Sequence, residues 1–141
     1  RTDRVATHQR HVSFPGGGWD VGDASMVATA LRETEEELGV RQEDVEVLGV
    51  LEGTDTGPFA VSAFVALIPY PYPFHPSADE VEEVLVIPLM ELRSLRRYGS
   101  HQRLYSGQRE TDYYDHPKGL VFGATARLLN QLLAVLDEAG V

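Results

Sequence analysis

The stretch that decides the fold is Leu31-Arg32-Glu33-Thr34-Glu35-Glu36-Glu37-Leu38-Gly39-Val40. It closes a predicted helix that runs from about Ala24 to Leu38 and ends at Gly39. At about 100° per residue, one side of this helix is a packing stripe made of Val27, Leu31, Thr34 and Leu38. Roughly the opposite side collects three carboxylates, because residues three and four apart are neighbours on a helix: Glu33, Glu36 and Glu37.

This concentration of negative charge is locally unfavourable. Like charges four residues apart repel by a few tenths of a kcal/mol, and acidic side chains near a helix C-terminus oppose the helix dipole. A solvated surface tolerates that cost, whereas a hard cation such as Mg²⁺ reverses its sign, because it prefers carboxylate oxygens. The periodicity by itself leaves both interpretations open. Arg32 lies one turn before Glu36 and is expected to pair with it.

A glycine-rich turn precedes the helix, in the sequence Phe14-Pro15-Gly16-Gly17-Gly18. Glycines let backbone amides or carbonyls approach a ligand closely, although an ordinary strand-to-helix loop is the alternative. No Gly-Lys-Ser/Thr follows, so the turn is not a Walker phosphate loop.

Together the turn and the helix resemble the Nudix box, Gly-x5-Glu-x7-Arg-Glu-U-x-Glu-Glu-x-Gly-U, where U is a bulky aliphatic residue. The segment from Arg32 to Val40 fits the second half, apart from Thr34 at one U position. The first half departs from the pattern. Counting from Gly17 places Asp23 at the acidic position with one inserted residue, and counting from Gly18 places Ala24 there. We favour the Asp23 alignment.

A narrower resemblance, to the coenzyme A diphosphatase branch of the Nudix family, covers most of the chain. It rests on His8-x-x-His11 before the glycine turn, Asp20-x-x-Asp23 after it, Ile87-Pro88-Leu89, and Phe122-Gly123-Ala124-Thr125-Ala126 before the last helix. Gln9-Arg10-His11 stands where that branch usually has x-Gly-Gln, and Val121-Phe122 replaces the usual Ile-Trp.

The resemblance implies an α+β fold, namely the Nudix α/β/α sandwich around a mixed β-sheet, in one domain over residues 1–141. It implies hydrolysis of a nucleoside diphosphate linked to a further group, with Mg²⁺ or Mn²⁺ as cofactor. Glu33, Glu36 and Glu37 would bind the metal, and Arg32 would orient a glutamate. The expected substrate contacts are His8, His11, Gly16 and Gly17. The first strand of the family fold has no counterpart here, so we expect either its absence or a smaller sheet.

Other side chains are candidates with ordinary alternatives. The general base is one of the box glutamates, Glu80 or Glu83. The aromatic residues of the proline-rich loop either stack on adenine or pack on one another: Tyr70, Tyr72, Phe74 and His75. The same choice applies to Tyr113, Tyr114 and His116, which precede the last helix.

The remaining elements follow from periodicity and turn residues. Strands are expected at Val45–Leu51, Phe59–Ile68 and Val81–Ile87, with shorter ones near Gln102–Tyr105 and Thr111–Tyr114. A short helix is expected near Pro88–Leu95, and an amphipathic helix over about Ala124–Ala139.

Composition excludes several classes of function. The chain has no cysteine, so disulfides and thiolate chemistry are excluded, and its formal net charge of −10 argues against a nucleic-acid partner. No apolar run approaches the ~20 residues of a membrane span, and no leader precedes Arg1, so we expect a cytoplasmic protein. A homodimer stays open.

Three functions remain at this point. The first is a coenzyme A or acyl-coenzyme A diphosphatase that releases 3′,5′-ADP and (acyl-)4′-phosphopantetheine. The second is a Nudix diphosphatase acting on ADP-ribose or a dinucleotide. The third is a non-catalytic Nudix-fold domain with a binding or regulatory role, and the three box glutamates argue against it.

Overall fold

A computed structural model describes residues 11–99 and 110–141 of the chain. Its helices are α1 (Met26–Leu38), the short 3₁₀ turn η1 (Gln42–Asp44), α2 (Leu89–Ser94) and α3 (Gly123–Glu138). Its strands are β1 (Glu46–Val50), β2 (Thr54–Thr56), β3 (Phe59–Val61), β4 (Phe64–Leu67), β5 (Arg96–Gly99), β6 (Thr111–His116) and β7 (Gly119–Val121). This mixture of helices and antiparallel sheets confirms the α+β class.

The strands form three antiparallel ladders, and the described residues contain no parallel pair. β1 pairs with β4 and carries an irregularity between Val47 and Gly49. β2 and β3 form a hairpin around Gly57, whose φ of +58° suits glycine. β5, β6 and β7 form the third ladder in that order.

The two long helices and the short helix α2 lie where the sequence predicts them. The expected strand over Phe59–Ile68 is interrupted at Ser62 and Ala63, so that its two parts belong to different ladders, β2–β3 and β1–β4. The expected strand over Val81–Ile87 is wrong. Glu80 and Val81 donate backbone hydrogen bonds to the Ser77 carbonyl, which turns the chain, and the following residues pair with no strand in the described part. The prediction near Gln102–Tyr105 lies outside the described residues.

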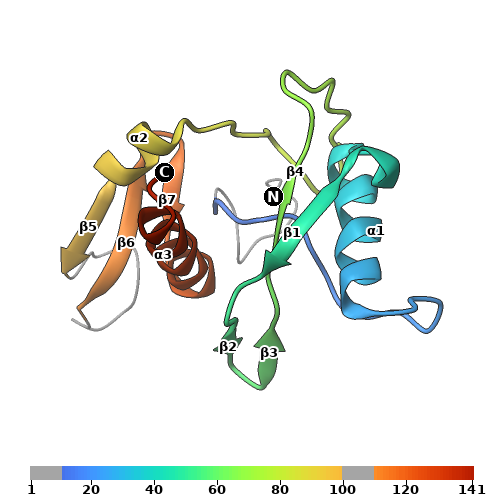
Figure 1. Cartoon of the computed structure of the whole chain (residues 1–141), viewed down its shortest axis with the longest axis horizontal. Helices are drawn as coiled ribbons and strands as arrows, with labels where there is room; N and C mark the ends of the chain where they lie inside the picture. Colours follow the sequence, from blue (N-terminus) through green and yellow to red (C-terminus); the bar gives the residue numbers. More distant parts are fainter. Residues whose placement is uncertain (1–10, 100–109) are drawn as a thin grey trace.

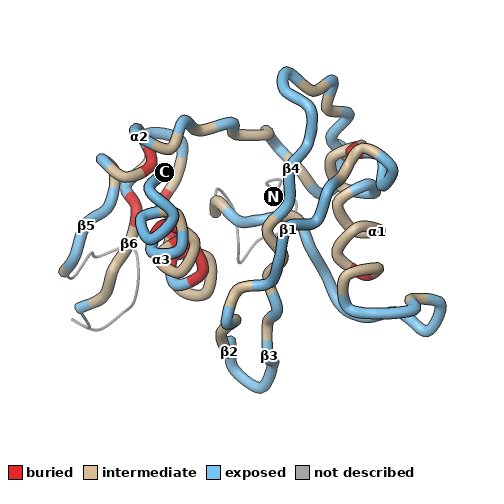
Figure 2. Tube along the Cα trace, viewed as in Figure 1, coloured by how far each residue is buried: buried red, intermediate tan, exposed pale blue. Residues whose placement is uncertain are grey.

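The molecule has two halves (Figure 1), and the buried core lies in only one of them. Figure 2 shows the buried positions concentrated around α3, β6 and β7. The cluster there contains Leu92, Tyr114, Val121, Ala126, Leu129 and Leu133. In the half that contains α1, β1 and β4, the described residues that are buried are Thr29 and Val40.

Helix α1 is held at both ends by specific backbone contacts. Ser25 caps its N-terminus, where the hydroxyl accepts a hydrogen bond from the Ala28 amide at 3.2 Å. Gly39 closes the C-terminus at φ +71°, with its amide bonded to the Glu35 carbonyl. The loop after β4 then satisfies two more carbonyls, because His75 donates to Leu38 and Ser77 donates to Glu37. The acidic end of the helix is therefore fixed in place.

Polar side chains of α3 join the two halves. Gln131 exchanges two hydrogen bonds with the backbone of Gly53, at 3.2 and 2.8 Å. Arg127 donates to the Thr54 hydroxyl and to the Asp55 carbonyl, both at 2.8 Å.

Among the described helices, none combines the length and the apolar character that crossing a membrane would require.

Candidate active site

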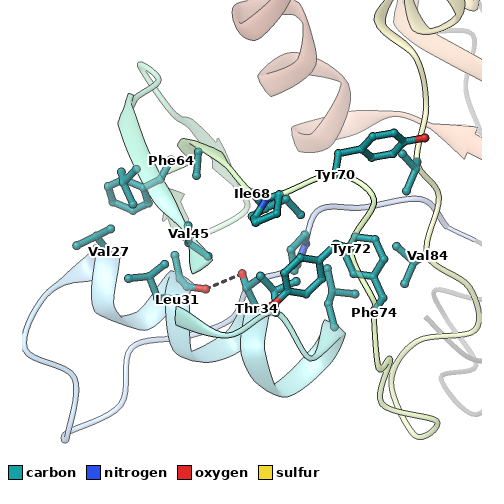
Figure 3. A pocket seen from close by; sticks show the side chains of 18 of the residues that line it. Val27, Leu31, Thr34, Val45, Phe64, Ile68, Tyr70, Tyr72, Phe74 and Val84 are labelled. Carbon is teal, nitrogen blue, oxygen red and sulfur yellow. Dashed lines mark hydrogen bonds between the residues drawn. The ribbon is translucent and has the colours of Figure 1, made fainter. Parts of the chain in front are cut away.

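The packing stripe of α1 faces the β1–β4 ladder, as the periodicity predicts. Its residues Val27, Leu31, Thr34 and Leu38 line an apolar cavity of about 430 Å³ together with side chains of β1, β4 and the aromatic loop. Figure 3 shows Val45, Phe64 and Ile68 across from Leu31, with the Thr34 hydroxyl bonded back to the helix. Within the described ranges, no carboxylate lines this cavity. The carboxylate side of the helix is therefore separate from its packing side.

Two of the box glutamates lie against the glycine turn. The Gly16 amide donates to Glu37 Oε1 at 2.9 Å. A Cβ placed on Gly17 would lie 2.6 Å from Glu33 Cδ, so any larger residue there would displace this carboxylate. In this structure the glycine turn contacts the glutamates. A residue without a Cβ is required at Gly17 for Glu33 to lie so close to it.

Arg32 ties the same carboxylates to the loop before the helix. Its Nη1 lies 3.0 Å from Glu33 Oε1 and 3.4 Å from Glu36, so the predicted Arg32–Glu36 ion pair is confirmed. Its Nε and Nη2 bond to the two oxygens of Asp23 at 2.9 and 3.0 Å, a bidentate arrangement. Arg32 also donates to the Gly18 carbonyl. One guanidinium therefore fixes the turn and two glutamates together.

Asp23, which the favoured alignment assigns to the first acidic position of the box, contacts Arg32 with both carboxylate oxygens. Its side chain is only 6% exposed and also accepts from the Asp20 amide and the Thr29 hydroxyl, both at 2.8 Å. The hydrogen bonds from Arg32 hold the pKa of Asp23 well below its ordinary value, and the same contacts raise the pKa of Arg32. Asp23 is thus an ionised anchor for Arg32. Sequence reasoning missed Thr29, which is the one buried polar residue of α1 and reads as an ordinary helical threonine.

The donor set fits a hard divalent cation by its chemistry. Glu33, Glu36 and Glu37 supply carboxylate oxygens on one helix, and a substituent at Gly17 would close the space beside Glu33. These side chains are nevertheless turned toward their protein partners. In the described ranges, no three acidic or histidine side chains already converge as a metal site. Metal binding by all three glutamates therefore requires their side chains to turn toward a common point.

A second cavity, of about 1130 Å³, lies beside the carboxylates and between the two halves. One wall contains Gly16 and Glu37, another contains Glu80 and Glu83, and a third is the turn between β6 and β7. His11 lines it as well, with its ring edge-on to Phe122 at a centroid distance of 4.9 Å. The structure thus brings together Gly16, His11 and Glu37, while His8 lies outside the described residues.

The two acidic candidates from the later segment differ in their contacts. Glu83 forms a close ion pair with Lys118 of the β6–β7 turn. Glu80 lines the cavity at the end of the turn that starts at Ser77. Because the Glu83 carboxylate is already engaged by Lys118, the geometry favours Glu80 over Glu83 as a base.

Several aromatic candidates have structural roles. Tyr72 donates to Asp44 Oδ2 at 2.6 Å and accepts from the Arg41 amide, and its ring packs on Phe74. The hydrogen bond to Asp44 raises the pKa of Tyr72. Tyr114 is fully buried and bonded to Asn130 at 2.6 Å, and burial raises its pKa. Of the remaining rings, Tyr70 is 83% exposed.

Comparison with known proteins identifies the family to which this chain is similar. A family model described as NUDIX domain matches residues 2–110. The Nudix hydrolase NudL of Cronobacter sakazakii is 39% identical over 150 residues, covering 97% of this chain and 74% of that protein. The NudL proteins of Citrobacter koseri (40% identical, 94% of this chain and 70% of that protein) and Pectobacterium atrosepticum (39%, 98% and 73%) are similar to it as well. These relatives are themselves described as uncharacterized.

Proposed function

Since this chain belongs to the NUDIX domain family and is a Nudix hydrolase, we propose that it hydrolyses the diphosphate bond of coenzyme A or an acyl-coenzyme A. Water would add to one phosphorus of the diphosphate and the bridging oxygen would leave with the other. The products would be 3′,5′-ADP and (acyl-)4′-phosphopantetheine. The substrate choice rests on the sequence resemblance, because the names of the relatives specify no substrate.

The observation that carries the proposal is the contact of Glu33 and Glu37 with the glycine turn at the edge of a cavity. Gly16 bonds to Glu37 at 2.9 Å, and both residues line the cavity of about 1130 Å³. This volume is slightly larger than the roughly 300–1,000 Å³ of typical small-molecule sites, so the cavity has room for a nucleotide-sized ligand. A diphosphate placed there would meet Glu37 and the glycine turn on one wall and the acidic segment around Glu80 on another.

Negative charge is the chemical obstacle, because carboxylates alone repel a diphosphate. Glu33, Glu36 and Glu37 would hold Mg²⁺ or Mn²⁺, which when bound neutralises phosphate oxygens and lowers the pKa of a bound water. The residues of the chain then have three tasks. Arg32 keeps Glu33 and Glu36 in register, the glycine turn leaves room beside Glu33, and Glu80 or a box glutamate accepts the proton of the attacking water.

Hydrogen bonds from the neighbouring loops hold α1 in a fixed position, which suits a helix that presents metal ligands. His75 and Ser77 satisfy the carbonyls of Leu38 and Glu37, while Asp23 fixes Arg32 from the other side. A hydrolytic site gains from ligands held in fixed relation, since small displacements reduce rates strongly.

A panel of diphosphates tests the proposal. The purified protein is incubated with Mg²⁺ and with coenzyme A, ADP-ribose and a dinucleotide, and the products are identified by mass spectrometry, with a chelator as the metal-free control. We expect the fastest metal-dependent cleavage with coenzyme A. Faster cleavage of ADP-ribose would replace the substrate, and cleavage of no compound would favour a binding or regulatory domain.

A further inference from the structure

We propose that Lys118, assisted by His116, binds a phosphate group of the substrate in the cavity that contains Glu37 and Gly16. The inference rests on the proposed function and adds a specificity-determining residue to it. None of the box residues supplies such a contact, because Arg32 is engaged with Asp23 and two glutamates.

The first argument is the distribution of charge. Lys118 is the only lysine of a chain whose formal net charge is −10. Among the described residues that line the cavity, it is the sole lysine or arginine, and the acidic residues of the same lining are Glu37, Glu80, Glu82, Glu83 and Asp115. An anionic substrate entering such a cavity needs a cation besides the metal, and an ammonium is a suitable partner for phosphate.

The second argument is the support beneath the lysine. Lys118 lies in the tight turn that joins β6 to β7, where His116 pairs with Gly119. Two residues further along the ladder, Tyr114 pairs with Val121, and their exposed fractions are 0% and 1%. The turn is therefore supported by two of the least exposed residues in the described part of the chain. Figure 1 shows this ladder in the half opposite α1, so Lys118 meets the substrate from the other side of the cavity.

His116 supplies a second donor at the same place. Its Nδ1 accepts a hydrogen bond from the Lys118 amide at 3.0 Å. In the neutral ring Nε2 then carries the hydrogen, because one imidazole nitrogen donates when the other accepts. The turn thus presents an ammonium and an N–H group within three residues.

Glu83 would hold Lys118 while no substrate is bound. Their ion pair is solvent-exposed, with side-chain exposures of 55% and 50%. Exposed pairs of this kind contribute little, and a phosphate with two negative charges is a stronger partner. Binding would therefore replace Glu83 by the substrate at Lys118.

Coenzyme A carries two anionic groups that an ammonium can bind, the 3′-phosphate and the diphosphate. Dephospho-coenzyme A lacks only the 3′-phosphate, so comparing the two substrates distinguishes the sources. The steady-state constants of the wild-type protein are compared with those of Lys118→Ala, Lys118→Arg and Arg41→Ala. The last variant is the control, because Arg41 is an exposed cation paired with Glu43 and lies outside the cavity.

We expect Lys118→Ala to raise KM for coenzyme A about tenfold or more, the usual effect of losing a charged hydrogen bond. Lys118→Arg should restore most of the affinity, and Arg41→Ala should behave as wild type. A rise confined to coenzyme A assigns Lys118 to the 3′-phosphate, and an equal rise with dephospho-coenzyme A assigns it to the diphosphate. An unchanged KM for both in an active protein overturns the inference and leaves the proposed function standing.

A second measurement does not depend on turnover. Because the chain has one lysine, acetylation of its side chain can be followed by mass spectrometry, with the N-terminal amine as internal reference. In the presence of a chelator, 3′,5′-ADP should slow acetylation of Lys118 and leave the reference amine unaffected. Equal rates with and without 3′,5′-ADP would contradict the inference even if the protein hydrolyses none of the diphosphates.

Discussion

The two halves of this molecule are stabilised by different physical means. The half with α3, β6 and β7 buries a continuous apolar cluster, including Leu92, Val121 and Leu129. The half with α1 buries Thr29 and Val40 and relies on polar contacts: Asp23 with Arg32, Gly16 with Glu37, and Ser77 with the Glu37 carbonyl. Figure 2 shows the difference in burial between the described parts of the two halves.

The difference indicates that the apolar core and the charged candidate site lie in different halves of the molecule. Apolar burial is roughly proportional to the area removed from water and tolerates changes of pH and salt. Ion pairs and charged hydrogen bonds are directional and fix carboxylates in place, but they depend on protonation. The half that contains the three box glutamates is therefore the half whose structure depends on charge.

Removing one carboxylate at the glycine turn should have the largest effect. Glu37→Gln keeps the size and one acceptor oxygen but removes the negative charge, so kcat/KM for the diphosphate substrate should fall by about 10²-fold or more. Cooperative thermal unfolding should persist. Glu35→Gln is the matched control, because Glu35 is exposed on the same helix and no role at the site is assigned to it. Equal activity of the two variants would remove Glu37 from the metal site.

Shortening one leucine in each half sharpens the comparison of their cores. Leu129 is buried at 6% exposure, whereas Leu31 lines an open apolar cavity and is only partly buried. Leu129→Ala should lower the free energy of unfolding by about 3 kcal/mol, and Leu31→Ala by about 1 kcal/mol. Urea unfolding followed by circular dichroism measures both. Similar losses would show that α1 is as well packed as α3.

Breaking the Asp23–Arg32 pair should have a smaller effect, concentrated on activity. Asp23→Asn weakens the hold on Arg32 and should lower kcat/KM about tenfold through misplacement of Glu33 and Glu36. The asparagine side chain keeps one acceptor oxygen, so the loop that precedes α1 should largely retain its conformation.

The same pair predicts a dependence of stability on pH. Because the pKa of Asp23 is lowered on folding, its contribution is complete above the ordinary value of 3.8 and is lost as the pH falls below it. Thermal midpoints measured from pH 7 to pH 2 should therefore decline less steeply below pH 4 in Asp23→Asn than in the wild type. Parallel declines would show that Asp23 does not stabilise the fold through its charge.

Local patterns predicted the parts of the fold whose determinants are adjacent in sequence. The packing stripe of α1 follows from the spacing of its apolar residues. The end of the helix at Gly39 follows from the ability of glycine to adopt a left-handed conformation, and the structure shows both features. The strand predicted at Val81–Ile87 was wrong, because apolar and β-branched residues indicate which positions avoid water and not whether another strand lies beside them. Its residues Val84 and Leu85 line both cavities instead of a ladder.

The sequence by itself determined that three carboxylates share one side of a helix and that a glycine turn precedes them, since both depend only on helical period and chain order. Tertiary structure decided their partners. Arg32 reaches back nine residues to Asp23, Glu37 meets Gly16, and Lys118 meets Glu83 across 35 residues. Contacts between distant segments depend on how the chain returns on itself, and no local periodicity carries that information.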